Sequence, residues 1–145
     1  MSGVHLLALI LAVAPLGACA PPLTSLRVER FAADPTANHF EPLDRTITDP
    51  AAVRELAQTV RTLPAAFGGE RFCGIGGGLR YRLTFAGTPK TSFVAIVEGD
   101  GCREAHLGLF DRRSTTESFW ATLAGALGFY TRGNDLFPLP LEWQR

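Results

Sequence analysis

The stretch LRYRLTF, residues 79–85, carries the clearest structural pattern in this 145-residue chain. Apolar and polar side chains alternate along it, which predicts a β-strand with one face buried and the other in water. Arg80 and Arg82 then lie together on the polar face. Two such arginines can bind an anion or an acidic partner, although a simply solvated sheet face is the commoner outcome.

A second strand is predicted at residues 93–97, where the apolar run FVAIV leads into Asp100-Gly101. Asp-Gly is a favoured pair for a two-residue hairpin turn. The expected partners are Glu98 and Arg103, Ile96 and Ala105, Ala95 and His106, and Val94 and Leu107. This register gives the hairpin one face that is apolar except at its tip.

Two helices are also predicted. Asp49-Pro50 places an acidic N-cap before proline at the first helical position, and Pro64 ends the apolar stripe that follows. The four residues 114–117, STTE, match a capping box and open a second stripe that Gly128 closes.

Weaker strands are expected at residues 26–31 and 43–48. The sequence therefore predicts an α+β domain over residues 25–145, with element order ββαβββα and an antiparallel sheet covered on one face by both helices. Residues 129–145 contain too many prolines for regular structure and are too apolar to stay in solvent, so they are expected to pack across the domain.

The N-terminal residues predict export. The apolar run at residues 6–13, interrupted by Pro15, is too short to span a bilayer and is typical of a signal peptide. Residues 16–19, LGAC, resemble a bacterial lipobox, which implies a signal peptide at 1–18, acylation of Cys19 with diacylglycerol and a fatty acid such as palmitate, and a tether at 19–24. Cleavage after Ala20 is the alternative, and it would give a secreted protein beginning at Pro21.

Charge and cysteine content narrow the classes of function. Fourteen basic and 14 acidic residues balance, so nucleic acid is not an expected partner. With Cys19 as anchor, Cys73 and Cys102 remain of the three cysteines, and an oxidising compartment favours a disulfide between them. A metal site with His39 and His106 is the alternative, but no usual ligand spacing supports it.

No catalytic motif is present in the sequence. The glycine-rich residues 68–78 lack the lysine of a phosphate-binding loop, and no G-x-S-x-G string occurs. His39 or His106 could act as a general base, and Glu98, Asp100 and Glu104 cluster around one turn. We nevertheless expect no catalytic centre and no cofactor.

Several short segments resemble those of small secreted proteins and lipoproteins of high-GC bacteria, a group without an assigned activity. They are ITDPAAV (47–53), RFC (71–73), YRLTF (81–85), GDGC (99–102) and SFW (118–120). The resemblance implies export and supports the pairing of Cys73 with Cys102, and it assigns no functional residue. The expected function is that of a lipid-anchored extracytoplasmic module that binds a protein or envelope component, with a small secreted enzyme or enzyme inhibitor as the alternative.

Overall fold

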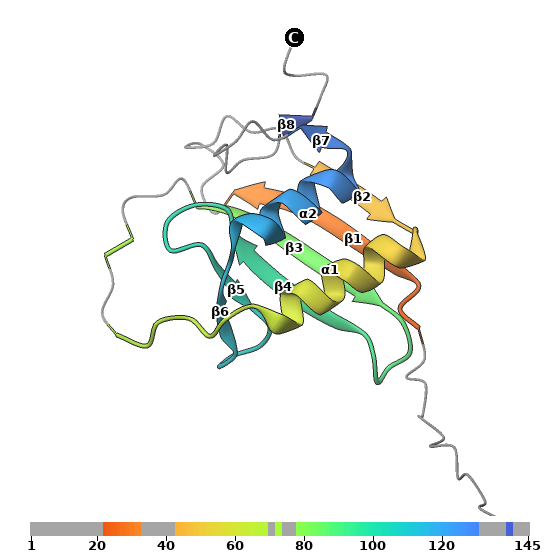
Figure 1. Ribbon diagram of the computed structural model, residues 1–145. Coiled ribbons are helices and arrows are strands. Elements are labelled where there is room, and N and C mark those ends of the chain that lie inside the picture. The colour runs from red at the N-terminus through yellow and green to blue at the C-terminus, as the bar shows by residue number, and fades with distance from the viewer. Residues whose placement is uncertain (1–21, 33–42, 70–71, 74–77, 131–138, 141–145) are drawn as a thin grey trace, which may run out of the picture.

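Six strands form one antiparallel sheet in the order β2-β1-β3-β4-β5-β6, and two helices pack on one of its faces (Figure 1). This computed structural model describes residues 22–32, 43–69, 72–73, 78–130 and 139–140. The strands of the sheet are β1 (Ser25–Ala32), β2 (Leu43–Ile47), β3 (Leu79–Ala86), β4 (Phe93–Glu98), β5 (Glu104–His106) and β6 (Arg112–Ser114). The predicted α+β class and the predicted elements are confirmed, and β6 is an additional strand between β5 and the second helix.

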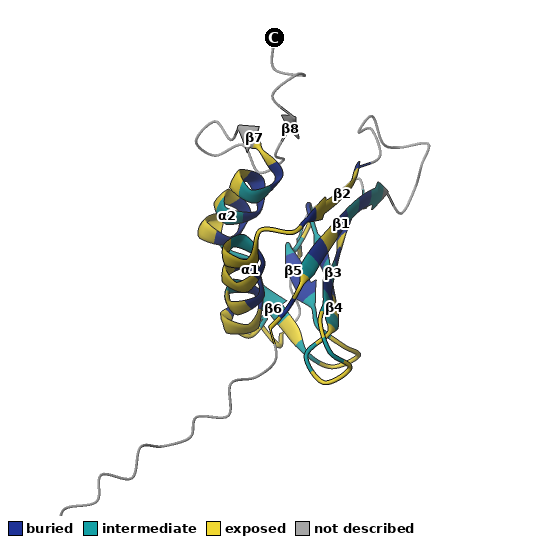
Figure 2. Ribbon diagram, turned by 90° about the vertical axis from the view of Figure 1, so that its right-hand side faces the viewer, coloured by how far each residue is buried: buried dark blue, intermediate teal, exposed yellow. Residues whose placement is uncertain are grey.

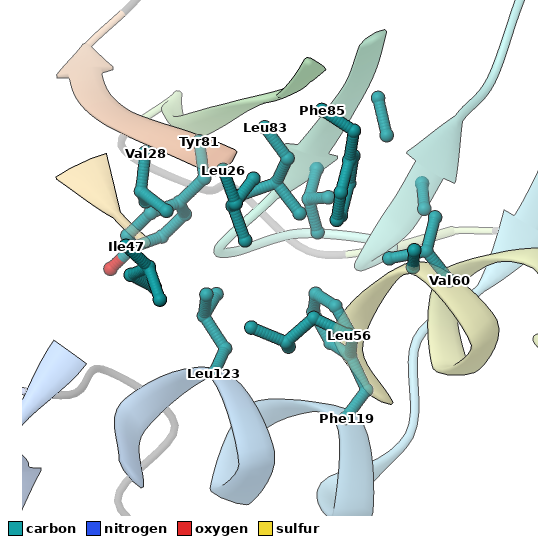
Figure 3. Close-up of a cluster of buried hydrophobic side chains, with 14 of the residues drawn as sticks. Leu26, Val28, Ile47, Leu56, Val60, Tyr81, Leu83, Phe85, Phe119 and Leu123 are labelled. Atoms are coloured by element: carbon teal, nitrogen blue, oxygen red, sulfur yellow. The ribbon is translucent and has the colours of Figure 1, made fainter. Parts of the chain in front are cut away.

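The central strand is β3, as its alternating sequence suggests. It pairs with β1 on one side and β4 on the other. Tyr81, Leu83 and Phe85 point toward the helices and are fully buried. Figure 3 shows them above Leu56 and Phe119, which come from the two helices. The core therefore lies between one face of the sheet and the helical layer.

The first helix, α1 (Pro50–Thr62), begins and ends where its sequence predicts. The side chain of Asp49 accepts a hydrogen bond from the Ala52 backbone at 2.8 Å, and Pro50 occupies the first turn. Its last helical residue is followed by Leu63 and then Pro64. Val53, Leu56 and Val60, spaced three and four residues apart, bury one face of the helix against the sheet.

The second helix, α2 (Glu117–Leu127), begins later than the capping-box prediction requires. Thr116 is the N-cap, and its hydroxyl accepts from the Phe119 backbone at 3.2 Å. Ser114 cannot cap the helix because it belongs to β6, where its backbone donates to Pro64 at 2.8 Å. The predicted C-terminus is confirmed, since Gly128 has a φ of 72°, a left-handed conformation that glycine adopts without strain.

The predicted register of the β4–β5 hairpin is wrong by one residue. Ile96 pairs with His106, and Val97 pairs with Ala105. The turn is longer than two residues, because Arg103 has a φ of 53° and its backbone donates to Asp100 at 3.2 Å. The shift turns Val97 toward the core and Ile96 away from it.

The edge of β6 that does not pair with β5 is hydrogen-bonded to the chain that follows α1. The backbone of Ala66 donates to the Arg112 carbonyl at 2.9 Å, and Ala65 forms a bridge with Arg113, so the chain that follows α1 runs along β6.

Beyond α2, strand β7 (Phe129–Tyr130) pairs with β8 (Leu139–Pro140). This short ladder is regular structure where the proline content predicted none.

Candidate functional site

The face of the sheet that points away from the helices is the candidate binding surface, called here the outer face. Figure 2 shows both helices on one side of the sheet, and none of the described helices or strands covers the other side. From the strand register, its side chains come from alternate positions of all six strands. They include Arg27, Glu29, Phe31, Asp44, Arg80, Arg82, Val94, Ile96, Glu98, Glu104, His106 and Arg112.

Ion pairs connect the outer face of β2, β1 and β3. Arg27 donates two hydrogen bonds to the carboxylate of Asp44, at 2.9 and 2.6 Å, and lies 3.3 Å from Glu29. The hydrogen bond from Arg27 holds the pKa of Asp44 below its usual value. Glu29 in turn lies 3.8 Å from Arg82. These three strands are joined by charge across the face as well as by their backbones.

Arg80 and Arg82 share the outer face, as the sequence predicts, but their surroundings differ. The guanidinium of Arg82 lies over the ring of Phe31, with 5.4 Å between its central carbon and the ring centroid. Arg80 stands opposite Phe31 in the register and is exposed. In the part of the chain that the structure describes, Arg80 makes no ion pair and no side-chain hydrogen bond. It is therefore available to an external anion.

A second charged group lies on β4, β5 and β6. Glu104 is almost completely buried, with 2% of its surface exposed. Its carboxylate accepts a hydrogen bond from Arg112 Nε at 2.7 Å and forms an ion pair with Arg112 Nη2 at 2.6 Å. His106 lies 3.6 Å from Glu98. Because a buried carboxylate without a partner is costly, removing Arg112 alone would destabilise this part of the sheet.

The contacts of His106 and of the hydroxyl groups at the start of α2 are distinct. His106 contacts Glu98, and the nearby Thr115 hydroxyl is bonded to the Arg103 carbonyl at 2.8 Å and to the indole of Trp120 at 3.1 Å. Thr116 caps α2. Among the described residues, the polar contact of His106 is with Glu98, and no hydrogen bond joins its ring to a hydroxyl group.

Cys73 and Cys102 form the predicted disulfide, with 4.7 Å between their Cα atoms. It joins the segment after α1 to the β4–β5 turn, and it excludes both sulfurs from metal binding. The described residues contain no group of three or more metal-ligating side chains.

The described residues line two surface cavities. One of about 410 Å³ is lined by residues of the segment 65–68 and of 110–113. The other, about 460 Å³, lies between α1, the start of the described chain and the β3–β4 turn. Neither is lined by His106, Arg80 or Arg82.

Several predicted features fall outside the described residues. They are the signal peptide, the acylated Cys19, residues 19–21 of the tether, His39, and most of the C-terminal segment. None of the described helices has the length and apolar character needed to cross a bilayer.

Comparisons of this chain with known proteins found no match. No protein-family model matches the chain, and no curated protein or solved structure is significantly similar to it. The resemblance to small secreted proteins and lipoproteins of high-GC bacteria stays a prediction, and the outer face has to be interpreted from its own chemistry.

Proposed function

We propose that this protein is a lipid-anchored extracytoplasmic binding module whose outer face takes up an acidic group of a protein or envelope partner. Arg80 carries this proposal. The other outer-face arginines, Arg27, Arg82 and Arg112, each have a carboxylate within 4 Å, whereas Arg80 has none among the described residues. An unpaired guanidinium beside an aromatic ring is suited to a carboxylate or phosphate.

The surroundings of Arg80 favour a binding surface over a reaction site. Phe31 stands opposite Arg80 on β1 and offers apolar area beside the charge, while on β4 Glu98 stands opposite Arg80 and Ile96 opposite Arg82. Glu29 pairs with both Arg27 and Arg82. A rigid surface that combines a central cation with apolar contacts is typical of protein interfaces. Export supports the same conclusion, since the sequence of residues 6–19 predicts it and the disulfide suits an oxidising compartment.

Photo-crosslinking in the native envelope tests the surface. With p-benzoylphenylalanine at position 31, we expect one discrete adduct, because this aromatic position adjoins Arg80. Arg80→Glu in the same background should lower the adduct yield about tenfold, which corresponds to about 1.4 kcal/mol of binding. Arg80→Lys should retain part of it, since lysine keeps the charge and loses the planar fork.

The matched controls lie on the helical layer. Glu55→Arg reverses an exposed charge on α1 and should leave the adduct at position 31 unchanged. The photo-crosslinker at position 55 itself should give no comparable product. An adduct at position 31 that Arg80→Glu leaves at full yield, or an adduct only at position 55, would contradict binding through the outer face.

A further inference from the structure

The end of the sheet where the described chain begins is defined by three segments. Ser25 at the start of β1 pairs with Ala86 at the end of β3, so residues 22–24 lie beside the β3–β4 turn, residues 87–92. Because β4 and β5 are antiparallel, the β5–β6 turn, residues 107–111, lies on the same lower side of the molecule, across the sheet from β1 (Figure 1). We call residues 22–24, 87–92 and 107–111, with the adjoining chain after α1, the tether end.

Large apolar side chains are exposed at the tether end. Leu109 and Phe110, in the β5–β6 turn, are 92% and 94% exposed. Phe67 is 66% exposed and lies near them, because the Ala66 backbone bonds to Arg112 and Phe67 lines the same 410 Å³ cavity as Phe110. One exposed leucine needs no explanation, but three large apolar groups at one tip indicate an interaction surface.

The tether end also carries positive charge. Lys90 is exposed in the β3–β4 turn. Arg61, at the last turn of α1, packs over the ring of Phe93 at 4.3 Å and borders the 460 Å³ cavity with Pro22. A surface that combines exposed aromatic groups with basic residues is complementary to anionic lipid headgroups.

The acidic residue of the β5–β6 turn does not offset all of this charge. Asp111 is paired with Arg113, whose hydrogen bond holds the pKa of the Asp111 carboxyl below its usual value. Arg54 lies further along the wall of the 460 Å³ cavity and adds a third cation to Lys90 and Arg61. Lys90 and Asp111 balance within the tether end itself, so the excess positive charge of this surface comes from Arg61 and Arg54 of α1, which border it.

The short chain between Cys19 and the folded domain limits how far the domain can lie from the bilayer. Leu23 is already part of the core, at 8% exposed, and four residue steps separate it from Cys19. Four steps span at most roughly 14 Å. Strand β3, of eight residues, is about 27 Å long, so the opposite end of the sheet, with the β4–β5 turn, stands well beyond that reach.

We infer that the tether end lies on the surface of the bilayer that holds Cys19, with Phe67, Leu109 and Phe110 inserted among anionic lipid headgroups. This inference rests on the proposed anchoring at Cys19. In this orientation the strands stand away from the membrane. The outer face and Arg80 then remain open to a partner in the extracytoplasmic space.

Depth-dependent fluorescence quenching tests this orientation. The full acylated chain is reconstituted into vesicles of phosphatidylglycerol and brominated phosphatidylcholine, and the emission of Phe110→Trp is compared with that of the parent protein. We expect roughly half of the added emission to be quenched, because side chains of interfacial segments lie about 5 to 10 Å deep. The bromine atoms quench only tryptophans that enter the lipid.

Phe72→Trp is the matched control. Phe72 is 93% exposed like Phe110, but it adjoins Cys73, whose disulfide to Cys102 places it near the β4–β5 turn at the far end of the sheet. Its added emission should be unaffected by the brominated lipid. Equal quenching at both positions, or quenching at neither, would overturn the inferred orientation.

Flotation of the same vesicles separates the two proposals. Protein that floats with the lipid while Phe110→Trp stays unquenched shows that the anchor works and that the orientation is wrong. Protein that fails to float, with no acyl mass on Cys19, overturns the anchoring and the orientation together.

Discussion

Cys73→Ser combined with Cys102→Ser is expected to lower the free energy of unfolding by about 3 to 4 kcal/mol. The disulfide closes a loop with a sequence separation of 29 residues, which contains residues 74–78 of the glycine-rich segment and strands β3 and β4. Without the bond the unfolded chain regains the entropy of that loop, while the folded state keeps its sheet. Urea unfolding followed by far-ultraviolet circular dichroism measures the difference.

Cys19→Ser is the control for that experiment. It removes the third thiol and leaves the Cys73–Cys102 bond, so the exported domain should unfold at the same urea concentration as the parent. A double variant whose urea midpoint equals that of the parent would show that the disulfide adds nothing to stability.

Val97→Asp is expected to be the most damaging single substitution in β4, and Val94→Asp one of the mildest. Val97 is fully buried and pairs with Tyr81 and Ala105, so a carboxylate there loses its hydration without gaining a partner. We expect a loss of about 4 kcal/mol or more. Val94 is 45% exposed on the outer face, and its replacement should cost about 1 kcal/mol or less.

The comparison tests the register directly, because the two-residue turn predicted from Asp100-Gly101 gives the opposite order. In that register Val94 faces the core and Val97 faces solvent. A Val94→Asp protein that fails to fold, beside a stable Val97→Asp protein, would contradict the observed pairing of Val97 with Ala105. Thermal unfolding of the two purified variants decides between these outcomes.

Local sequence patterns predicted the helices and strands correctly wherever tertiary packing favours the same conformation. The alternation of residues 79–85 identified the central strand, and Asp49, Pro50, Pro64 and Gly128 marked helix ends because each acts on backbone groups within a few residues. The two helices and the sheet followed from these signals.

The errors arose where distant partners decide the conformation. The Asp-Gly preference for a tight turn was overridden by β3, which places Val97 opposite Tyr81 and so fixes which face of β4 is buried. Residues 112–114, RRS, carry no apolar alternation, and they become a strand because they pair with β5 and hydrogen-bond to the chain after α1. That pairing also draws Ser114 away from the helix it was expected to cap.

The candidate site was predictable only as far as local alternation determines it. Alternation in one strand placed Arg80 and Arg82 on a common face. It could not show that Arg82 is paired with Glu29 and stacked on Phe31 while Arg80 has no described anionic partner, because β1 lies about 50 residues away in the sequence and its register is tertiary information.

Intact-mass measurement of the protein extracted from the envelope of the cells that make it tests the central claim most directly. We expect a chain that begins at Cys19 and carries the added mass of diacylglycerol and a fatty acid, and Cys19→Ser should release the protein from the membrane fraction. A chain that begins at Pro21 without acyl mass, or a Cys19→Ser protein that stays fully membrane-bound, would contradict a lipid-anchored module.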